Sequence, residues 1–385
     1  MKLTVRRNVI FASLITLCVY LFCYWTKFQG NITGFFRIGS IIPLSPYLDA
    51  TKALIYQGEL GYDGHLFLSL AFDPLLQNPA TILALDNPLY RYRRIFYPML
   101  GYLLGLGNPR LIPAALVAIN ALCISSLVGL MGWGLRQTRE PRWHALLVLC
   151  IPGVWLTFIF STADLVSTTL LVLAICCFRY RRPWATGIAI AAGCLTRETL
   201  LLGWLSLVIC AIGDRNWRQV KILFMSLIPV VSWNVYVLVR LSQQGSSSAG
   251  LNFTQPLVDI GGKFAALISG GWQMKNLFEA YLFLLLIGVF CLTFYLLRKK
   301  SSRIGQTRSN RRFDNRVLWI YAGFLALLFA FSNELIFTYY VGYGRVFMDI
   351  FCLLLLVLGQ PRTWLKVLPF FIAIIPCFAM LGFAQ

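Results

Sequence analysis

The chain has 385 residues, of which 58% are hydrophobic and 12% are charged. Soluble domains are about half apolar and about one quarter charged, so this composition excludes a solvated multidomain enzyme and equally excludes disorder. The formal net charge is +20, from 34 lysines and arginines against 14 aspartates and glutamates. Such an excess indicates a nucleic-acid partner in a soluble protein, but basic cytoplasmic loops in a membrane protein.

Apolar stretches of about 20 residues, the length that crosses a bilayer, recur along the chain. Nine of them are expected to form single spanning helices: 8–27, 111–135, 143–160, 161–180, 219–240, 277–297, 317–338, 343–359 and 364–383. The stretch 184–212 is too long for one span and is interrupted by Thr196, Arg197 and Glu198, so we expect two short helices that meet at a polar break. The prediction is an all-α polytopic membrane protein with about eleven transmembrane helices in one domain, 1–385.

The basic residues collect in alternate loops, as expected for loops that stay in the cytoplasm. Three of them, Lys2, Arg6 and Arg7, precede the first helix and predict a cytoplasmic N-terminus. With this segment, the loops at 136–142, 179–182, 215–221, 298–316 and 362–366 hold 22 of the 34 basic residues. Membrane topology therefore accounts for the charge, and no nucleic-acid partner is expected. An odd number of crossings places the C-terminus outside.

Two long segments, 28–110 and 241–276, fall on the predicted extracytoplasmic side, whereas the basic loop 298–316 falls on the cytoplasmic side. The first outer segment ends in an apolar stretch at 95–107, which is too short to span and is expected to lie in the interface or to re-enter the membrane. We therefore expect short interfacial helices in 28–110, together with the candidate active site.

Three arginines in the first outer segment, Arg91, Arg93 and Arg94, are not explained by topology, because basic residues in outer loops oppose the charge rule. Guanidinium groups match phosphate oxygens, so a phosphate at the membrane surface is one partner for the cluster. The alternative partners are the acids of the same loop, such as Asp86, or anionic lipid headgroups.

Asp63 stands between a glycine turn and an apolar run in the sequence Gly61, Tyr62, Asp63, Gly64, His65. Its simplest role is an N-cap, because aspartate commonly starts helices. A second role, compatible with the first, is a general base at the membrane surface, where partial desolvation tunes a carboxylate.

Charged residues inside predicted helices are costly and are therefore functional candidates. Arg197 and Glu198 mark the broken helix, where they either converge on a site or form a buried pair that orients helices. Asp164 stands at an outer helix start, where a carboxylate meets a favourable helix dipole.

Glu334 and Arg345 lie near the outer ends of two late helices. Topology does not explain Arg345, which makes it a second phosphate candidate. Asp349, one turn later, is its alternative partner.

The sequence offers little for nucleotide or metal chemistry. It has no P-loop and no Asp-x-Asp motif, and its two histidines, His65 and His144, are far apart. A histidine-based metal site is therefore not expected, and a divalent cation is an open alternative but not the expected one. Carboxylates, arginines and aromatic residues remain as candidates for the chemistry.

This arrangement of a short basic N-terminus, one helix, a long outer loop with an acidic motif and about ten further helices resembles the GT-C superfamily of integral-membrane glycosyltransferases. More narrowly, motifs within 61–113 and 194–200 look like those of bacterial cell-surface glycopolymer formation proteins. These motifs are Gly61-Tyr-Asp-Gly64 with Phe67, Asp86-Asn-Pro88, Tyr90-Arg91, Arg94-Ile95, Tyr97-Pro98 and Thr196-Arg-Glu198.

The resemblance implies transfer of a sugar from a polyprenyl-phosphate carrier to a glycan, lipid or polymer acceptor on the extracytoplasmic face of a membrane, most simply a bacterial inner membrane. It implies Asp63 as the base, with inversion at the anomeric carbon. Residues implied for the lipid phosphate are Arg93, Arg94, Arg197 and Arg345. Residues implied for the acceptor, the sugar or support of the site are Tyr62, His65, Asp86, Arg91, Asp164, Glu198 and Glu334.

Two other classes fit many helices with buried charges: a transporter or flippase of a lipid-linked saccharide, and a non-catalytic subunit of polysaccharide assembly. A transporter does not need a long polar loop with clustered arginines and aspartates after its first helix. A non-catalytic subunit is expected to tolerate substitution of Asp63 and Arg94.

Overall fold

The computed structural model describes residues 2–137, 140–241, 255–271, 273–298, 315–357 and 363–383. Part of the predicted outer segment 241–276 and most of the predicted cytoplasmic loop 298–316 lie outside these residues. Within them the fold is almost entirely helical, and its two short strands, β1 (Ile38–Gly39) and β2 (Ile55–Tyr56), pair in parallel with Ile38 opposite Ile55.

The first half of the chain contains eight α-helices: α1 (Lys2–Phe22), α2 (Asp63–Phe72), α3 (Pro79–Leu83), α4 (Pro88–Tyr92), α5 (Phe96–Leu104), α6 (Ile112–Gly134), α7 (Pro152–Ile159) and α8 (Asp164–Arg179). The second half contains α9 (Pro183–Thr196), α10 (Leu200–Gly213), α11 (Trp217–Met225), α12 (Leu227–Leu241), α13 (Val258–Ser269), α14 (Met274–Arg298), α15 (Arg316–Phe331), α16 (Glu334–Phe337), α17 (Tyr340–Val346), α18 (Met348–Leu356) and α19 (Thr363–Phe383). A π-helical turn, Cys23–Lys27, extends α1, and 3-10 helices occupy Ile32–Phe36, Leu135–Gln137 and Arg142–Cys150.

Four helices in the described part of the chain are long and apolar enough to cross a membrane: Thr4–Lys27, Ile112–Gly134, Trp217–Leu241 and Met274–Arg298. Four shorter apolar helices accompany them: Pro183–Thr196, Leu200–Gly213, Arg316–Phe331 and Trp364–Cys377. These lengths are compatible with an all-α multi-pass membrane protein. The number of eleven crossings remains a prediction.

The predicted single helix 143–160 is wrong. The chain instead forms the 3-10 helix Arg142–Cys150 and then α7, two segments bent by 54° that together make at most one broken span. The bend lies at Pro152, which is the first residue of α7, and the preceding Ile151 is extended. Proline has no N–H to donate and disfavours helical backbone in the residue before it, so a straight helix cannot pass this point.

Two further predicted helices are interrupted by local capping. The stretch 317–338 divides because Ser332 is extended and the side chain of Asn333 accepts a hydrogen bond from Leu335 N at 3.0 Å, which starts α16. The stretch 343–359 divides at Phe347, between α17 and α18.

The predicted polar break in 184–212 is confirmed. Helix α9 ends at Thr196, Arg197 adopts an extended conformation, and α10 begins at Leu200. The apolar stretch 95–107 contains α5, a nine-residue helix that packs against α2 and α6. Gly101 allows this close approach, since a Cβ there would lie 2.4 Å from a Leu116 methyl carbon.

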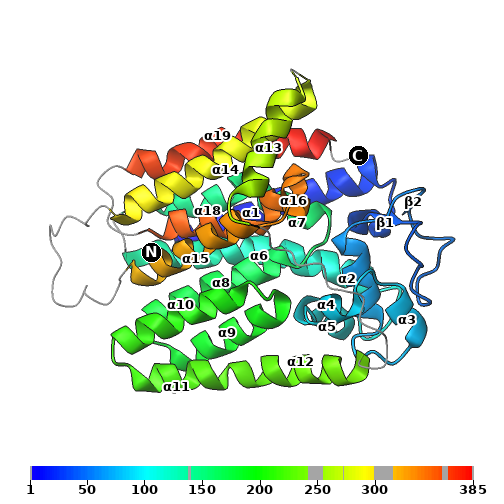
Figure 1. Ribbon diagram of the computed structural model, residues 1–385, viewed down its shortest axis with the longest axis horizontal. Coiled ribbons are helices and arrows are strands. Elements are labelled where there is room, and N and C mark those ends of the chain that lie inside the picture. The colour runs from blue at the N-terminus through cyan, green and yellow to red at the C-terminus, as the bar shows by residue number, and fades with distance from the viewer. Residues whose placement is uncertain are drawn as a thin grey trace.

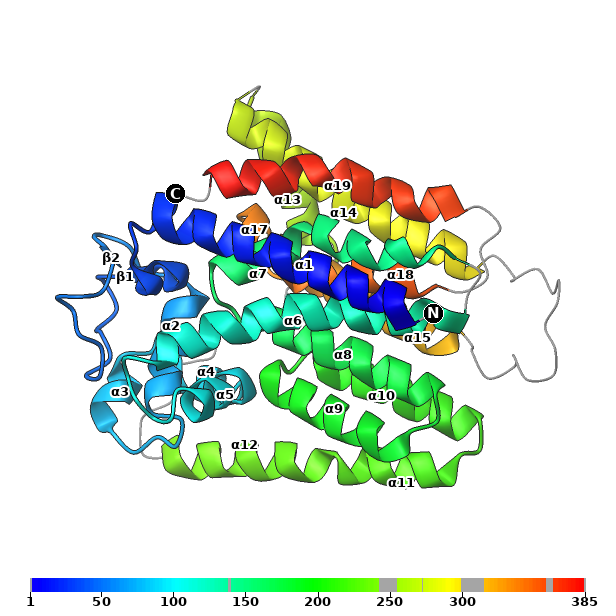
Figure 2. The same ribbon diagram turned by 180° about the vertical axis from the view of Figure 1, so that it is seen from behind.

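The helices form a bundle with different elements at its two ends (Figure 1). Helices α2–α5 and the two strands gather at one end, near the break between α9 and α10. The start of α1 and the turn between α10 and α11 lie at the opposite end, as the reverse view also shows (Figure 2). In the core, α6 packs against both α1 and α8.

Ion pairs at the opposite end join segments that were predicted to be cytoplasmic. Arg316 lies 2.5 Å from Asp214, and the buried Lys366 lies 2.8 Å from Glu140. The side of the membrane on which these loops lie remains a prediction.

The contact between α7 and α17 depends on Gly153. A Cβ at this position would lie 2.4 Å from Gly344 O and 2.7 Å from Met348 Cβ. We expect Gly153→Ala to destabilise the fold by about 1–3 kcal/mol, because the backbones must separate. The measurement is thermal unfolding in detergent.

The matched control is Gly288→Ala in α14, where an added Cβ meets nothing within 4 Å. It should be neutral or stabilising by about 0.5–1 kcal/mol, since alanine favours helix over glycine. Equal melting temperatures for the Gly153 variant and wild type would refute the close-contact argument.

Candidate functional site

Asp63 is the first residue of α2, at the centre of a cluster of charged side chains. The chain reaches it through Gly61, whose φ of +83° suits glycine, and through the extended Tyr62. Gly64 then lets α2 approach the loop after α7, because a Cβ there would lie 2.2 Å from Phe160 O. These features fix the start of α2 against the bundle.

The N-cap interpretation of Asp63 is wrong. Tyr62 occupies the cap position, and no side chain caps the helix. The Asp63 carboxylate binds two arginines instead: Oδ1 accepts a hydrogen bond from Arg91 Nη1 at 2.8 Å, and Oδ2 accepts one from Arg345 Nη2. Asp63 and Arg345 are 282 residues apart in the sequence.

Arg91 lies on α4, a short helix capped by the Asn87 side chain. Asp86 binds its guanidinium in a bidentate manner, at 2.8 Å from Nε and 2.6 Å from Nη2. The sequence left three partners open for Arg91: a phosphate, the acids of the same loop or anionic lipid headgroups. In the structure Arg91 binds the acids of its own loop. Such paired, charge-assisted hydrogen bonds fix the orientation of the guanidinium.

Arg345 joins the outer loop to the helices. Besides Asp63, it binds Asp164 Oδ2 at 3.0 Å, and its guanidinium stacks over the Tyr62 ring at 4.8 Å. Asp164 also lies 3.3 Å from Arg197 and accepts a hydrogen bond from the Thr162 hydroxyl at 2.8 Å. The alternative pairing of Arg345 with Asp349 is wrong, because Asp349 accepts hydrogen bonds from Tyr321 and Thr168.

These contacts form one chain of alternating charge, which we call the charge chain: Asp86, Arg91, Asp63, Arg345, Asp164 and Arg197. Except for Asp86, each side chain is at most 15% exposed. Burial would raise the pKa of Asp63, but the positive charges of Arg345 and Arg91 outweigh burial and hold this pKa well below its usual range. Asp63 is therefore ionised at any physiological pH.

Arg94 and Glu198 form a second pair beside the charge chain, with Arg94 Nε 3.0 Å from Glu198 Oε2. The Arg94 guanidinium also stacks on the Tyr90 ring at 4.1 Å. Arg197 and Glu198 thus do not pair with each other. The break between α9 and α10 sends Arg197 towards Asp164 and Glu198 towards the outer loop.

Arg93 differs from its neighbours, because its side chain has no hydrogen-bond or ion-pair partner in the described part of the chain, and its Nε is buried. His65 is also buried, with neither ring nitrogen hydrogen-bonded to a described residue. Burial lowers the pKa of His65 to about 4, so the ring is neutral at pH 7. Glu334 is exposed at the start of α16 and is not part of the cluster.

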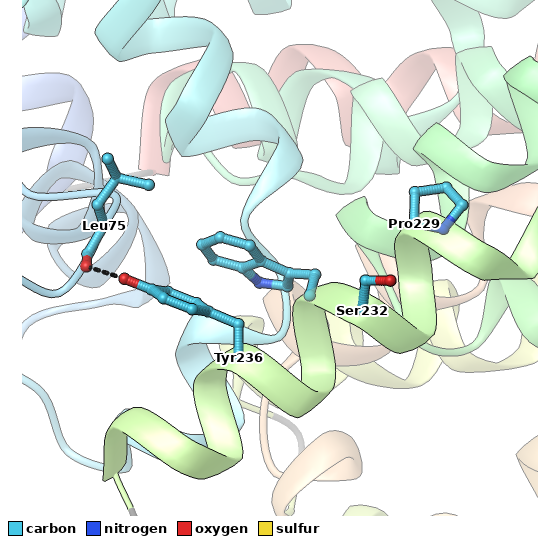
Figure 3. Close-up of a pocket in the computed structure, with 5 residues that line it drawn as sticks. Leu75, Pro229, Ser232 and Tyr236 are labelled. Carbon is cyan, nitrogen blue, oxygen red and sulfur yellow. Dashed lines mark hydrogen bonds between the residues drawn. The ribbon is translucent and has the colours of Figure 1, made fainter.

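An apolar groove of about 520 Å³ lies between α12 and the loop after α2 (Figure 3). Its lining residues are Leu75, Pro229, Ser232, Trp233 and Tyr236. Trp233 donates a hydrogen bond to Tyr92 O at 2.7 Å, so the groove adjoins the segment that carries Arg91 and Arg93. The sequence analysis did not predict this groove. The available signal was Trp233 and Tyr236, two aromatic residues three positions apart in the predicted span 219–240.

The described residues contain no group of three or more histidine, cysteine, aspartate or glutamate side chains arranged to hold a metal ion. The site as described is made of carboxylates, guanidinium groups and aromatic rings.

Comparison with known proteins gave no match, whether with family models, with curated proteins or with solved structures.

The charge chain predicts a large stability effect from loss of a central carboxylate. Asp164→Asn would leave Arg345 and Arg197 buried with one less negative charge, so we expect destabilisation of about 3–5 kcal/mol. The measurement is the melting temperature in detergent.

Glu334→Gln is the matched control, because it removes one carboxylate that is exposed and outside the cluster. It should change stability by less than about 0.5 kcal/mol. Similar melting temperatures for the two variants would contradict the importance of the charge chain.

Proposed function

We propose that the protein is a membrane glycosyltransferase that moves a sugar from a polyprenyl-phosphate carrier to a glycan or lipid acceptor on the extracytoplasmic face. The observation that carries the proposal is that three features adjoin α4: Asp63 binds Arg91 of this helix, Arg93 follows it with a buried Nε that has no partner in the described part of the chain, and the apolar groove touches it through Trp233. Transfer from a lipid-phosphate sugar donor requires a carboxylate to accept the proton, a cation to bind the phosphate and an apolar groove to hold the lipid.

Arg93 is the first contact that we assign to the donor phosphate. Its buried Nε lacks a partner among the described residues, and an unsatisfied buried donor is costly unless a ligand completes it. Arg94, Arg197 and Arg345 are already paired with acids. They would reach the phosphate only by exchanging partners.

Such an exchange would also activate Asp63. A carboxylate bound by two arginines has a low pKa and is a weak base. The charge of the donor phosphate would compete with Asp63 for Arg345 and Arg91. Asp63 would then lose positive neighbours, and its pKa would rise towards a useful range. In this scheme the base is ready only when the donor is bound.

The proposed reaction is a single displacement. Asp63 accepts the proton of an acceptor hydroxyl, and the oxygen forms a bond to the anomeric carbon while the bond from that carbon to the phosphate oxygen breaks. The lipid phosphate leaves with the electron pair of that bond, and the arginines stabilise its charge. The configuration at the anomeric carbon is inverted.

The groove on α12 is the site that we assign to the first isoprene units of the donor. It is lined mainly by apolar side chains and adjoins α4, which Arg93 follows directly. Exposed apolar residues continue along the same helix, among them Val231, Val235 and Val239. A polyprenyl tail could therefore pass from the groove into the lipid.

Two rival functions have support of their own. The broken helices at Pro152 and Arg197, next to buried charges, also suit a lipid-linked saccharide transporter. The complete pairing within the charge chain also suits a non-catalytic assembly subunit, in which the pairs serve only to lock the loop. Both rivals predict no sugar transfer by the purified chain.

The base assignment predicts that Asp63→Asn lowers kcat by at least about 100-fold, because the amide cannot accept the proton. The assay uses the purified protein in liposomes with a polyprenyl-phosphate sugar donor. The melting temperature is measured in parallel, so that loss of folding is recognised. Asp49→Asn, which removes an exposed carboxylate of the same loop, should retain activity. Turnover of a folded Asp63→Asn variant within about threefold of wild type would exclude Asp63 as the base.

The phosphate assignment predicts that Arg93→Gln raises KM for the donor about tenfold and changes kcat less, because a ground-state contact is lost. Arg110→Gln is the control, since this arginine is exposed in the same outer segment. An unchanged KM for the Arg93 variant would remove this residue from the donor site.

A further inference from the structure

A polar cavity, distinct from the apolar groove on α12, lies at the end of the bundle opposite the charge chain. It has a volume of about 420 Å³ and lies between the turn joining α8 to α9, the turn joining α10 to α11 and the start of α15. Asp214 is the one acid among its described lining residues. Four arginines also line it: Arg179, Arg181, Arg215 and Arg316. The cavity therefore has an excess of positive charge.

The helix ends around the cavity add to this positive potential. Helix α11 begins there, with Asn216 as its N-cap and as part of the lining. Helix α15 also begins there, with Arg316 and Val317. Free N–H groups and the helix dipole make such N-termini favourable for anions.

Gln219 gives an independent sign of a missing ligand. The residue is part of the cavity lining and is 2% exposed, yet its side-chain Nε2 has no hydrogen-bond partner in the described part of the chain. Buried amide groups are normally satisfied, so an orphan donor at the wall of a basic cavity indicates an absent acceptor. Membrane topology requires basic residues in these loops, but it does not require this buried donor.

Two of the arginines occupy positions that favour glycine. Arg181 and Arg215 both have a φ of 54°, each just after the end of a helix. A left-handed conformation is unfavourable for arginine, and glycine is the usual residue there. Replacement by glycine should therefore remove the charge while preserving the turn.

We propose that this cavity binds a phosphate-bearing anion. The same chemistry could come from an anionic phospholipid headgroup or from a soluble phosphate. Trp184 and Trp217 lie close to the two turns and are 54% and 60% exposed. Exposed tryptophans are typical of the membrane interface, which is where a lipid headgroup would meet this cavity.

The test uses the full chain in a neutral maltoside detergent, with binding measured by calorimetry and by thermal shift. The probes are inorganic phosphate, dihexanoyl phosphatidylglycerol and, as a control without net charge, dihexanoyl phosphatidylcholine. Saturable binding of phosphate supports a soluble anion as the ligand. Binding of phosphatidylglycerol without binding of phosphate supports a lipid headgroup. If neither probe binds, the proposal is overturned.

Three variants locate the bound anion: Arg181→Gly, Arg215→Gly and Gln219→Leu. Each should weaken binding at least about tenfold, and the two glycine variants should melt at or above the wild-type temperature in the absence of ligand. Arg218→Gln, which removes an exposed charge outside the cavity lining, should bind as wild type does. Wild-type affinity in both folded glycine variants would overturn the proposal even if an anion binds elsewhere.

Discussion

The ion pair between Asp63 and Arg345 is the contact on which the end of the bundle that carries α2–α5 depends. It joins residues 282 positions apart and connects the outer loop to α17. Ions removed from water are tolerated only when they are paired, so each member of the charge chain requires the next. The chain extends this requirement from Asp86 in the loop to Arg197 at the helix break, and thereby fixes the loop against three separate parts of the bundle.

The short breaks in the apolar segments make this network possible. A straight helix through Arg197 and Glu198 would not separate these two residues, whereas the break there lets Arg197 reach Asp164 and Glu198 reach Arg94 of the loop. Glycine allows the ends to approach, as at Gly153 against Gly344 O. Helices too short to span independently are therefore the elements that position the charges.

The two ends of the bundle use their charges differently. At the end that carries α2–α5 acids and arginines alternate, and the buried Nε of Arg93 has no partner in the described part of the chain. At the opposite end arginines outnumber acids around a cavity with an orphan amide at Gln219. The net charge of +20 is therefore unevenly distributed, and it is on the unpartnered donors at each end that the two proposed anion sites rest.

The sequence by itself determined the helical class, the apolar segments, the polar break at Thr196 and the identity of the charged residues around Asp63, because hydropathy, proline and charge are local properties. Only the tertiary structure decided which charges meet: Arg345 with Asp63 and Asp164 instead of Asp349, Arg94 with Glu198, and Glu334 with none of them. Pairing depends on how distant helices pack, and neither spacing nor composition specifies that packing. The bend at Pro152 was not predicted, although the proline that causes it is visible in the sequence, and the groove beside Trp233 required the fold.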